Sequence, residues 1–247
     1  MFFRKGGGIF VRIILYIMRL TQKVSFWFFF FGGGGSREVQ EDNNGKLNPS
    51  HYKEYLSVFS QYKAVYAWNG HNHENFYYNY EGKTTKHGAP NIQCISVARA
   101  TGALRFNREI AAKGEPQGYM VMEVAGDSLS WYYKGVGIGK ETQMRAYSPL
   151  KTNDATVKVN IWNWSEGWST PEWYENGVKV SDMEFTPGID IAYLELYNTI
   201  TNKTTKKYCT PSKESLIFSV TPTPGVTSGE IRVVDLFGNV YTEKITW

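Results

Sequence analysis

The chain has 247 residues, enough for one or two domains, and 42% of them are hydrophobic, which is ample for a core. Its net charge of +4 is too small to predict nucleic-acid binding, which requires a clustered basic face. No C-x-x-C pair is present, so a structural zinc site of that type is excluded. Cys94 and Cys209 are predicted to be buried thiols, and a disulfide between them is the alternative.

Residues 1–35 differ in character from the rest of the chain. Their apolar stretch at 9–18 is interrupted by Arg12 and is shorter than the roughly 20 residues of a membrane span. Basic residues precede it, as in a signal peptide, but no A-x-A-like cleavage site follows. The runs of Phe and Gly at 28–35 are typical of a frameshifted stretch. We therefore expect a non-native segment or a leader; upstream DNA that encodes a conventional secretory leader in this frame would contradict a non-native origin.

Residues 36–105 begin with a polar, turn-rich loop and continue with a helical pattern. Behind the N-cap candidate Ser50, apolar residues recur at i, i+3, i+4 and i+7, namely Tyr52, Tyr55, Leu56 and Phe59. The predicted helix leads into an apolar strand at 64–68, which ends in Asn-Gly. In an α/β fold, ligands gather in loops of this kind beyond the C-terminal ends of strands.

Two histidines follow this strand with one residue between them, His71 and His73. Neutral imidazole is a common ligand of zinc, iron and manganese ions. At this spacing two imidazoles do not easily share one tetrahedral ion, but each can serve one of two adjacent ions. In two-metal hydrolases such ions lie roughly 3.5–4 Å apart and clamp the oxygens of a phosphoryl transfer. On the motif alone, a solvated turn that holds two histidines is an equally good interpretation.

The rest of the chain has the pattern of a β domain. After strands expected at 76–80 and 92–97, short alternating strands are separated by Gly, Pro and Asn turns from residue 118 on. The candidates in this series are 119–124, 128–134, 143–147, 156–161, 172–175, 191–197, 215–220, 230–235 and 240–245. Residues 125–127 and Asn176-Gly177 are hairpin signals. Strands at this spacing predict an all-β sandwich.

The histidine motif and an ordered series of later segments resemble the calcineurin-like metallophosphoesterases. Gly-His-x-His after an apolar strand is similar to the last ligand motif of that family. The later segments resemble the C-terminal domain of a group of bacterial members: GYMVMEV (118–124), SWYYK (130–134), QMRAYSP (143–149), NIWNW (160–164) and DLFGNVYTE (235–243). The resemblance covers about residues 50–247. The ordered series is far more specific than the histidine pair.

The resemblance implies an α+β fragment, in which the C-terminal end of an α/β metallophosphoesterase domain is followed by an all-β sandwich-like domain. After the non-native or leader segment at 1–35, it assigns 36–105 to the remnant of the catalytic domain and 106–247 to the β-sandwich C-terminal domain. In the complete parent enzyme it implies two divalent ions of the Mn, Fe or Zn class. A hydroxide that bridges these ions would attack the phosphoester in line.

The same resemblance implies the roles of individual residues. His71 would serve one ion and His73 the other, each with its second ring nitrogen held by a carboxylate or carbonyl. Polar neighbours are candidates for holding these ligands or for contacting the substrate, although polar residues in a turn need no such role: Asn69, Asn72, Glu74 and Asn75.

The chain departs from the family pattern upstream of the histidine pair. Calcineurin-like enzymes also use D-x-H, G-D and G-N-H motifs and a further histidine, but this chain has no D-x-H, no G-N-H and no histidine before His51. Its G-D dipeptide, Gly126-Asp127, lies downstream in a hairpin. Two imidazoles alone do not hold a dinuclear pair tightly or lower the pKa of a bound water to near neutral. We therefore expect this chain to be inactive or nearly so by itself, with no tightly bound metal and no catalytic residue of its own.

Two non-catalytic functions remain as alternatives for the β domain. As a binding module, it would present seven aromatic residues to a carbohydrate, lipid headgroup or cell-surface ligand: Trp131, Tyr132, Tyr133, Trp162, Trp164, Trp168 and Trp173. Three or more of these rings exposed on one face would favour the module. As a lid, it would pack on the catalytic domain and shape its cleft. We rank the lid higher, because aromatic residues in strands usually form core.

The partner implied by the resemblance is the phosphoester substrate of the parent enzyme. Phosphodiester, phosphomonoester, nucleotide and phospholipid all remain open. We predict no nucleic-acid partner and no membrane span, and the sequence does not indicate an oligomeric state. Bacterial members of the family usually carry export signals, so a periplasmic or cell-surface location is implied by resemblance alone.

Overall fold

The computed structural model of the chain describes residues 18–21, 24–26, 65–69, 75–80, 92–98, 110–126 and 128–247. These residues fall into two compact units, and residues 75–77 belong with those from 97 on. The predicted helix after Ser50 lies outside the described residues, so the α/β character of 36–105 stays a prediction. The same holds for the predicted domain boundary at 105/106, which lies between described segments.

The first unit contains short strands. β1 (Met18–Thr21) and β2 (Val24–Phe26) form an antiparallel pair. A three-stranded sheet has the order β3-β5-β4 and consists of β3 (Val65–Asn69), β5 (Ile92–Ser96) and β4 (Phe76–Tyr80), the last of which begins in the second unit. β3 and β5 are parallel, with Val65 opposite Ile92 and Asn69 opposite Ser96. The three strands predicted in this part of the sequence are thereby confirmed.

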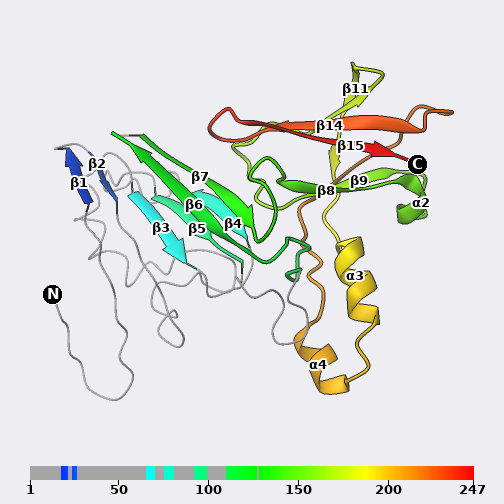
Figure 1. The fold of residues 1–247 in the computed structure, drawn as a ribbon, viewed down its shortest axis with the longest axis horizontal. Helices are drawn as coiled ribbons and strands as arrows, with labels where there is room; N and C mark the ends of the chain where they lie inside the picture. Colours follow the sequence, from blue (N-terminus) through cyan, green and yellow to red (C-terminus); the bar gives the residue numbers. More distant parts are fainter. Residues whose placement is uncertain are drawn as a thin grey trace. The chain divides into compact units, whose positions relative to one another are not determined.

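The second unit contains two four-stranded antiparallel sheets (Figure 1). One has the order β12-β13-β9-β8 and consists of β12 (Glu184–Phe185), β13 (Ile217–Val220), β9 (Val157–Ile161) and β8 (Met144–Tyr147). The other has the order β11-β10-β14-β15 and consists of β11 (Val178–Asp182), β10 (Glu172–Glu175), β14 (Ser228–Val234) and β15 (Val240–Thr246). A separate hairpin is formed by β6 (Gly118–Ala125) and β7 (Ser128–Gly135). All but one of the strands predicted from residue 118 on are confirmed, and their ends agree to within two residues.

Apolar residues of both sheets pack into one core. Val159 on β9, Trp173 on β10 and Ile231 on β14 each have no exposed surface. The other members of this cluster are Met144, Val157, Ile161, Trp168, Met183, Phe218, Val233 and Tyr241. At Gly229 on β14, an added Cβ would lie 2.1 Å from the Trp173 ring, so only glycine lets the indole cross the strand. The predicted β-rich character of the C-terminal part is confirmed, with a shared core between two sheets.

The two hairpin signals are also confirmed. Asn176 and Gly177 connect β10 to β11 with φ angles of 50° and 78°, as a type I′ turn requires. Between β6 and β7, Ala125 pairs with Ser128, and Gly126 has a φ of 58°. In both places a residue that tolerates positive φ sets the register of the strands that follow.

One predicted strand is wrong, because residues 191–197 lie in helix α3 (Ile191–Asn198). Asp190 begins this helix as its N-cap, and its carboxylate accepts a hydrogen bond from the backbone N–H of Tyr193 at 2.9 Å. The alternation of large apolar residues favoured a strand, but Ala, Leu and Glu are strong helix formers and the cap decides the outcome.

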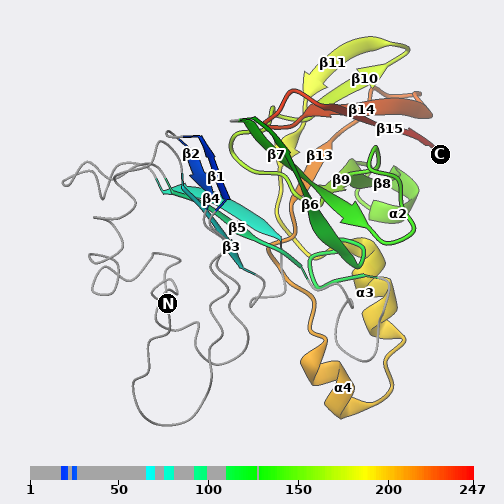
Figure 2. The ribbon, with the colours of Figure 1, turned by 60° about the vertical axis from the view of Figure 1, so that its left-hand side comes forward.

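Two further helices complete the described part, α2 (Pro149–Thr152) and α4 (Lys203–Tyr208). Figure 2 shows α3 and α4 in succession below the sheet that contains β8 and β9. None of the helices in the described residues is long and apolar enough to span a membrane.

Candidate functional site

The structure describes only part of the predicted site. His71 and His73, together with Asn72 and Glu74, lie outside the described residues. Asn69 ends β3, and its backbone alone is described. The predicted roles of these residues as metal ligands or as their neighbours therefore stay predictions.

Asn75, two residues after His73, is the candidate whose surroundings are described. Its side chain is 1% exposed. The Nδ2 group donates to the carbonyl of Trp162 at 3.1 Å, and Oδ1 accepts from the backbone N–H of Ala98 at 2.7 Å. The backbone N–H of Asn75 donates to Oε1 of Glu115 at 3.3 Å. Both ends of the buried amide thus bond to the protein, as a buried polar group requires.

In the part of the chain that the structure describes, no group of three or more His, Cys, Asp or Glu side chains could hold an ion. Cys209 is buried, as predicted, and the side chain of Cys94 is not described.

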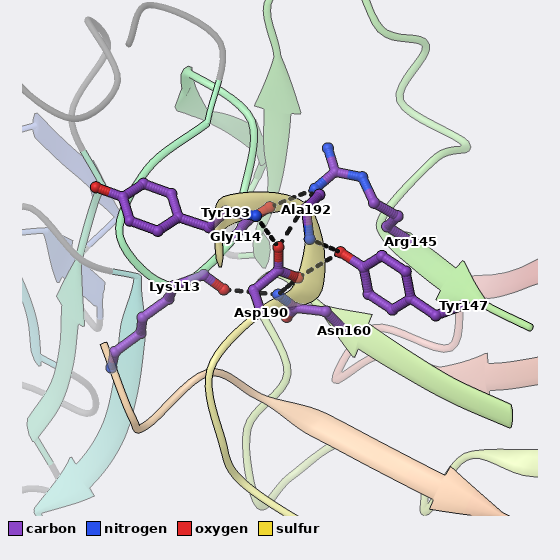
Figure 3. Close-up of polar contacts among 8 residues, drawn as sticks. All are labelled: Lys113, Gly114, Arg145, Tyr147, Asn160, Asp190, Ala192 and Tyr193. Carbon is purple, nitrogen blue, oxygen red and sulfur yellow. Dashed lines mark hydrogen bonds and ion pairs between the residues drawn. The ribbon is translucent and has the colours of Figure 1, made fainter. Parts of the chain in front are cut away.

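A buried carboxylate, Asp190, lies at the centre of a polar cluster of the β domain (Figure 3). The hydroxyl of Tyr147 donates to Oδ2 at 2.6 Å, and Nδ2 of Asn160 donates to the same oxygen at 2.8 Å. Oδ1 caps α3 through the N–H of Tyr193 and lies 3.9 Å from Nη1 of Arg145. The carboxylate has no exposed surface, so its charge is stabilised by these donors and not by water.

The backbone of the segment 111–116 accepts hydrogen bonds from two side chains of this cluster. Asn160 also donates to the carbonyl of Lys113 at 2.6 Å, and Arg145 donates to the carbonyl of Gly114 at 2.9 Å. Gly114 has a φ of +87°, and a Cβ added there would lie 2.1 Å from Cγ of Asp190. Glycine is therefore needed at this position both for its backbone angle and for the space beside the carboxylate.

The cluster holds elements of the domain together through hydrogen bonds. Burial, and after it the Asp190 carboxylate, raises the pKa of the Tyr147 hydroxyl, so the phenol stays protonated and donates. The cluster joins β8, β9, α3 and the segment 111–116 through a carboxylate that is closed off from solvent. Sequence reasoning did not single out Asp190, although an Asp before a run of helix formers is a signal for an N-cap.

A cleft of about 330 Å³ lies beside the cluster, between α3 and the sheet of β9 and β13. Its lining includes Tyr147, Thr186 and Ile191. Its charged lining residues, Asp154 and Lys158, form an ion pair with each other at 2.5 Å. The Lys158 ammonium beside Asp154 holds the pKa of that carboxyl well below its usual range.

The seven aromatic residues that define the binding-module alternative are mostly core. Five of them are less than 9% exposed, namely Trp131, Tyr133, Trp162, Trp168 and Trp173. Tyr132 and Trp164 are partly buried. The prediction that most of these rings are buried is therefore confirmed, and these seven residues do not form the exposed aromatic face that a binding module needs.

Comparison with protein families gives a match to the C-terminal part of the chain. A family model described as "C terminal of Calcineurin-like phosphoesterase" matches residues 105–241. Searches of curated proteins and of solved structures found no match. The matched residues include the sheet β12-β13-β9-β8, the β6–β7 hairpin and the Asp190 cluster. Of the other four-stranded sheet they include β10, β11, β14 and the first two residues of β15.

Proposed function

The chain belongs to the family of C-terminal domains of calcineurin-like phosphoesterases, and from this premise we propose that it is the C-terminal portion of a metal-dependent phosphoester hydrolase. The match over 105–241 carries the proposal, because it spans more than half of the chain. The same family membership supports a phosphoester substrate and, by resemblance alone, a periplasmic or cell-surface location.

We further propose that this chain is not a complete catalyst. A dinuclear centre needs a bridging carboxylate and several ligands for each ion, whereas the sequence offers the pair His71 and His73 without the D-x-H and G-N-H motifs. This donor set does not fit two ions, so no step of hydrolysis is assigned to residues of this chain.

Of the two non-catalytic alternatives, we propose the lid: the β domain packs on the catalytic domain of the parent enzyme and shapes its cleft. The burial of its aromatic residues supports this role over a carbohydrate- or cell-surface-binding module. Large aromatic side chains inside a shared core stabilise the domain, while sugar-binding sites need such rings on a solvent-facing surface.

An activity assay on the full chain tests the proposal. We expect purified protein with added Mn²⁺ to hydrolyse bis(p-nitrophenyl) phosphate and p-nitrophenyl phosphate no faster than a variant that carries both His71→Ala and His73→Ala. Robust turnover that this double variant loses would refute the proposed inactivity. Turnover that both proteins share would indicate a contaminating phosphatase, and mass spectrometry of the preparation would identify it.

Sequencing of the genomic DNA upstream of the reading frame gives a second test. Motifs of the types D-x-H, G-D and G-N-H in another frame would support a complete parent metallophosphoesterase. Their absence from all three frames would contradict the proposed parent and leave the histidine pair as a relic.

A further inference from the structure

Helix α4 (Lys203–Tyr208) carries a concentration of positive charge. Both views of the fold show it beyond α3, away from the strands of the two four-stranded sheets (Figure 1, Figure 2). Three of its residues are lysines, and the stretch 196–213 around it contains a fourth lysine and no aspartate or glutamate. Four lysines without an acidic residue give this stretch a charge of +4, as large as the net charge of the whole chain.

The helix presents these charges to solvent on one side. Residues three and four positions apart are neighbours on a helix surface, which places Lys203 beside Lys206 and Lys207. Lys203 and Lys207 are exposed. Lys206 is partly buried, and its ammonium lies 4.9 Å from the centre of the Tyr197 ring. Tyr208, which follows Lys207, is 65% exposed, so the helix also offers an aromatic ring to solvent.

The charges of α4 are not neutralised within the part of the chain that the structure describes. None of the three lysines forms an ion pair with a described residue. Four other lysines of the β domain do form one: Lys151, Lys158, Lys179 and Lys244. Lys206 and Lys207 lie in the last turn, where the helix dipole favours cations, but Lys203 begins the helix, where the dipole favours anions. The stability of α4 does not explain Lys203, which points to a partner outside the domain.

The residue types of α4 fit a diffuse anionic surface better than a single phosphate group or a nucleic acid. Lysine is a point charge on a flexible stem, whereas arginine suits planar, bidentate contacts with phosphate, and the stretch 196–213 contains no arginine. Tyrosine is enriched where membranes meet water, because its ring is apolar and its hydroxyl is polar. Binding of single strands uses several rings on which successive bases stack, and α4 offers one.

We propose that α4 is a docking surface for a membrane that is rich in anionic phospholipid. The three lysines of α4 lie at the headgroup phosphates, and Tyr208 enters the interface between headgroups and acyl chains. Each lysine contributes about fivefold to binding at low salt, so the three together contribute about 100-fold. The contact is peripheral and reversible, and it is independent of the proposed hydrolase function.

Binding of the full chain to vesicles tests the proposal. Sedimentation compares vesicles of equal parts phosphatidylglycerol and phosphatidylcholine with vesicles of phosphatidylcholine alone. The test variant carries Lys203→Gln, Lys206→Gln and Lys207→Gln, and glutamine has nearly the helix propensity of lysine, so α4 is retained. We expect this variant to bind the anionic vesicles about 100-fold more weakly than the unmodified chain. Binding of the unmodified chain should also fall between about 0.1 M and 1 M salt, as the Debye length shrinks from about 10 Å to about 3 Å.

A second triple variant removes the same charge from exposed lysines elsewhere in the domain: Lys151→Gln, Lys179→Gln and Lys244→Gln. Both variants lower the formal net charge from +4 to +1, so a difference between them reports the position of the charge. Residues 1–35 carry basic and apolar residues of their own, and they are the same in all variants. We expect the control to bind within about threefold of the unmodified chain, because distant charges are screened. Equal losses in both variants, or no loss in the α4 variant, would overturn the proposal.

Hydrogen–deuterium exchange of the unmodified chain locates the contact and decides the proposal even if the triple variant does not fold. We expect anionic vesicles to slow the exchange of residues 203–208, and Tyr208→Ala to weaken binding at least about threefold. Binding that leaves the exchange of α4 unchanged would overturn the proposal, since another segment would then make the contact. Single-stranded DNA that binds more tightly than the vesicles, through the same lysines, would also overturn it in favour of a nucleic-acid contact.

Discussion

Asp190→Ala is the substitution that most directly probes the construction of the β domain. It removes the acceptor of three donors: the Tyr147 hydroxyl, the Asn160 amide and the backbone N–H of Tyr193 in the first turn of α3. Loss of an N-cap costs about 1 kcal/mol, and each buried donor left without an acceptor costs about 1–3 kcal/mol. Asn160 keeps its bond to the carbonyl of Lys113, which limits the loss. We expect a total decrease of about 3–5 kcal/mol in the free energy of unfolding.

Urea unfolding followed by tryptophan fluorescence and by far-UV circular dichroism measures this decrease. Asp154→Ala is the control, because Asp154 forms an ion pair with Lys158 while 45% of its side chain is exposed. An exposed pair of this kind contributes less than about 1 kcal/mol. A loss below about 1 kcal/mol for Asp190→Ala, or equal losses for both variants, would refute the view that the buried carboxylate organises the domain.

Two further predictions follow from the same cluster. The pKa of Tyr147 is raised by burial and by Asp190, so its contribution to stability is complete below its ordinary pKa near 10 and is lost as the pH rises toward the folded value. Tyr147→Phe should therefore reduce the alkaline loss by up to about 1.4 kcal/mol per pH unit, and equal slopes in urea unfolding between about pH 9 and pH 11 would contradict this. Gly114→Ala should destabilise by at least about 3 kcal/mol and Gly177→Ala by about 1 kcal/mol, because both have positive φ but only Gly114 lies against a buried side chain. Thermal unfolding compares the two, and equal shifts would show that Gly114 is not packed on Asp190.

Alternation and turn chemistry were sufficient to predict most strands of the β domain. β10 alternates between buried and partly buried residues, and its Asn-Gly turn sets the register with β11. The edge strands β11 and β12 were not predicted, because β11 carries only the short alternation of Val178 and Val180, β12 has only two residues, and the side chains of both strands are mostly exposed. α3 was misread since its alternation suited a strand, while the deciding signal was the single capping residue before it.

The Asp190 cluster could not be predicted from the sequence for a different reason. Asp190 lies 43 residues from Tyr147 and 30 from Asn160 along the chain, and no local pattern relates them. Asn75 was identified from its place near the histidines, but its hydrogen-bond partners lie 23 to 87 residues away along the chain and could not be predicted. Local rules predict strands and turns, whereas long-range polar contacts are decided by how the sheets pack.

The segment NIWNW, which contributed to the family resemblance, joins two polar networks of the β domain. Asn160 reaches the Asp190 cluster with its side chain, and two residues later the carbonyl of Trp162 accepts from Asn75. Ile161 between them is fully buried in the shared core. One strand end thus contributes to the core, to the Asp190 cluster and to the hydrogen bonds of Asn75. The contacts of Asn160 and Ile161 are made by their side chains, whereas that of Trp162 is made by its backbone carbonyl, so we expect substitutions at Asn160 and Ile161 to destabilise the domain by separate routes.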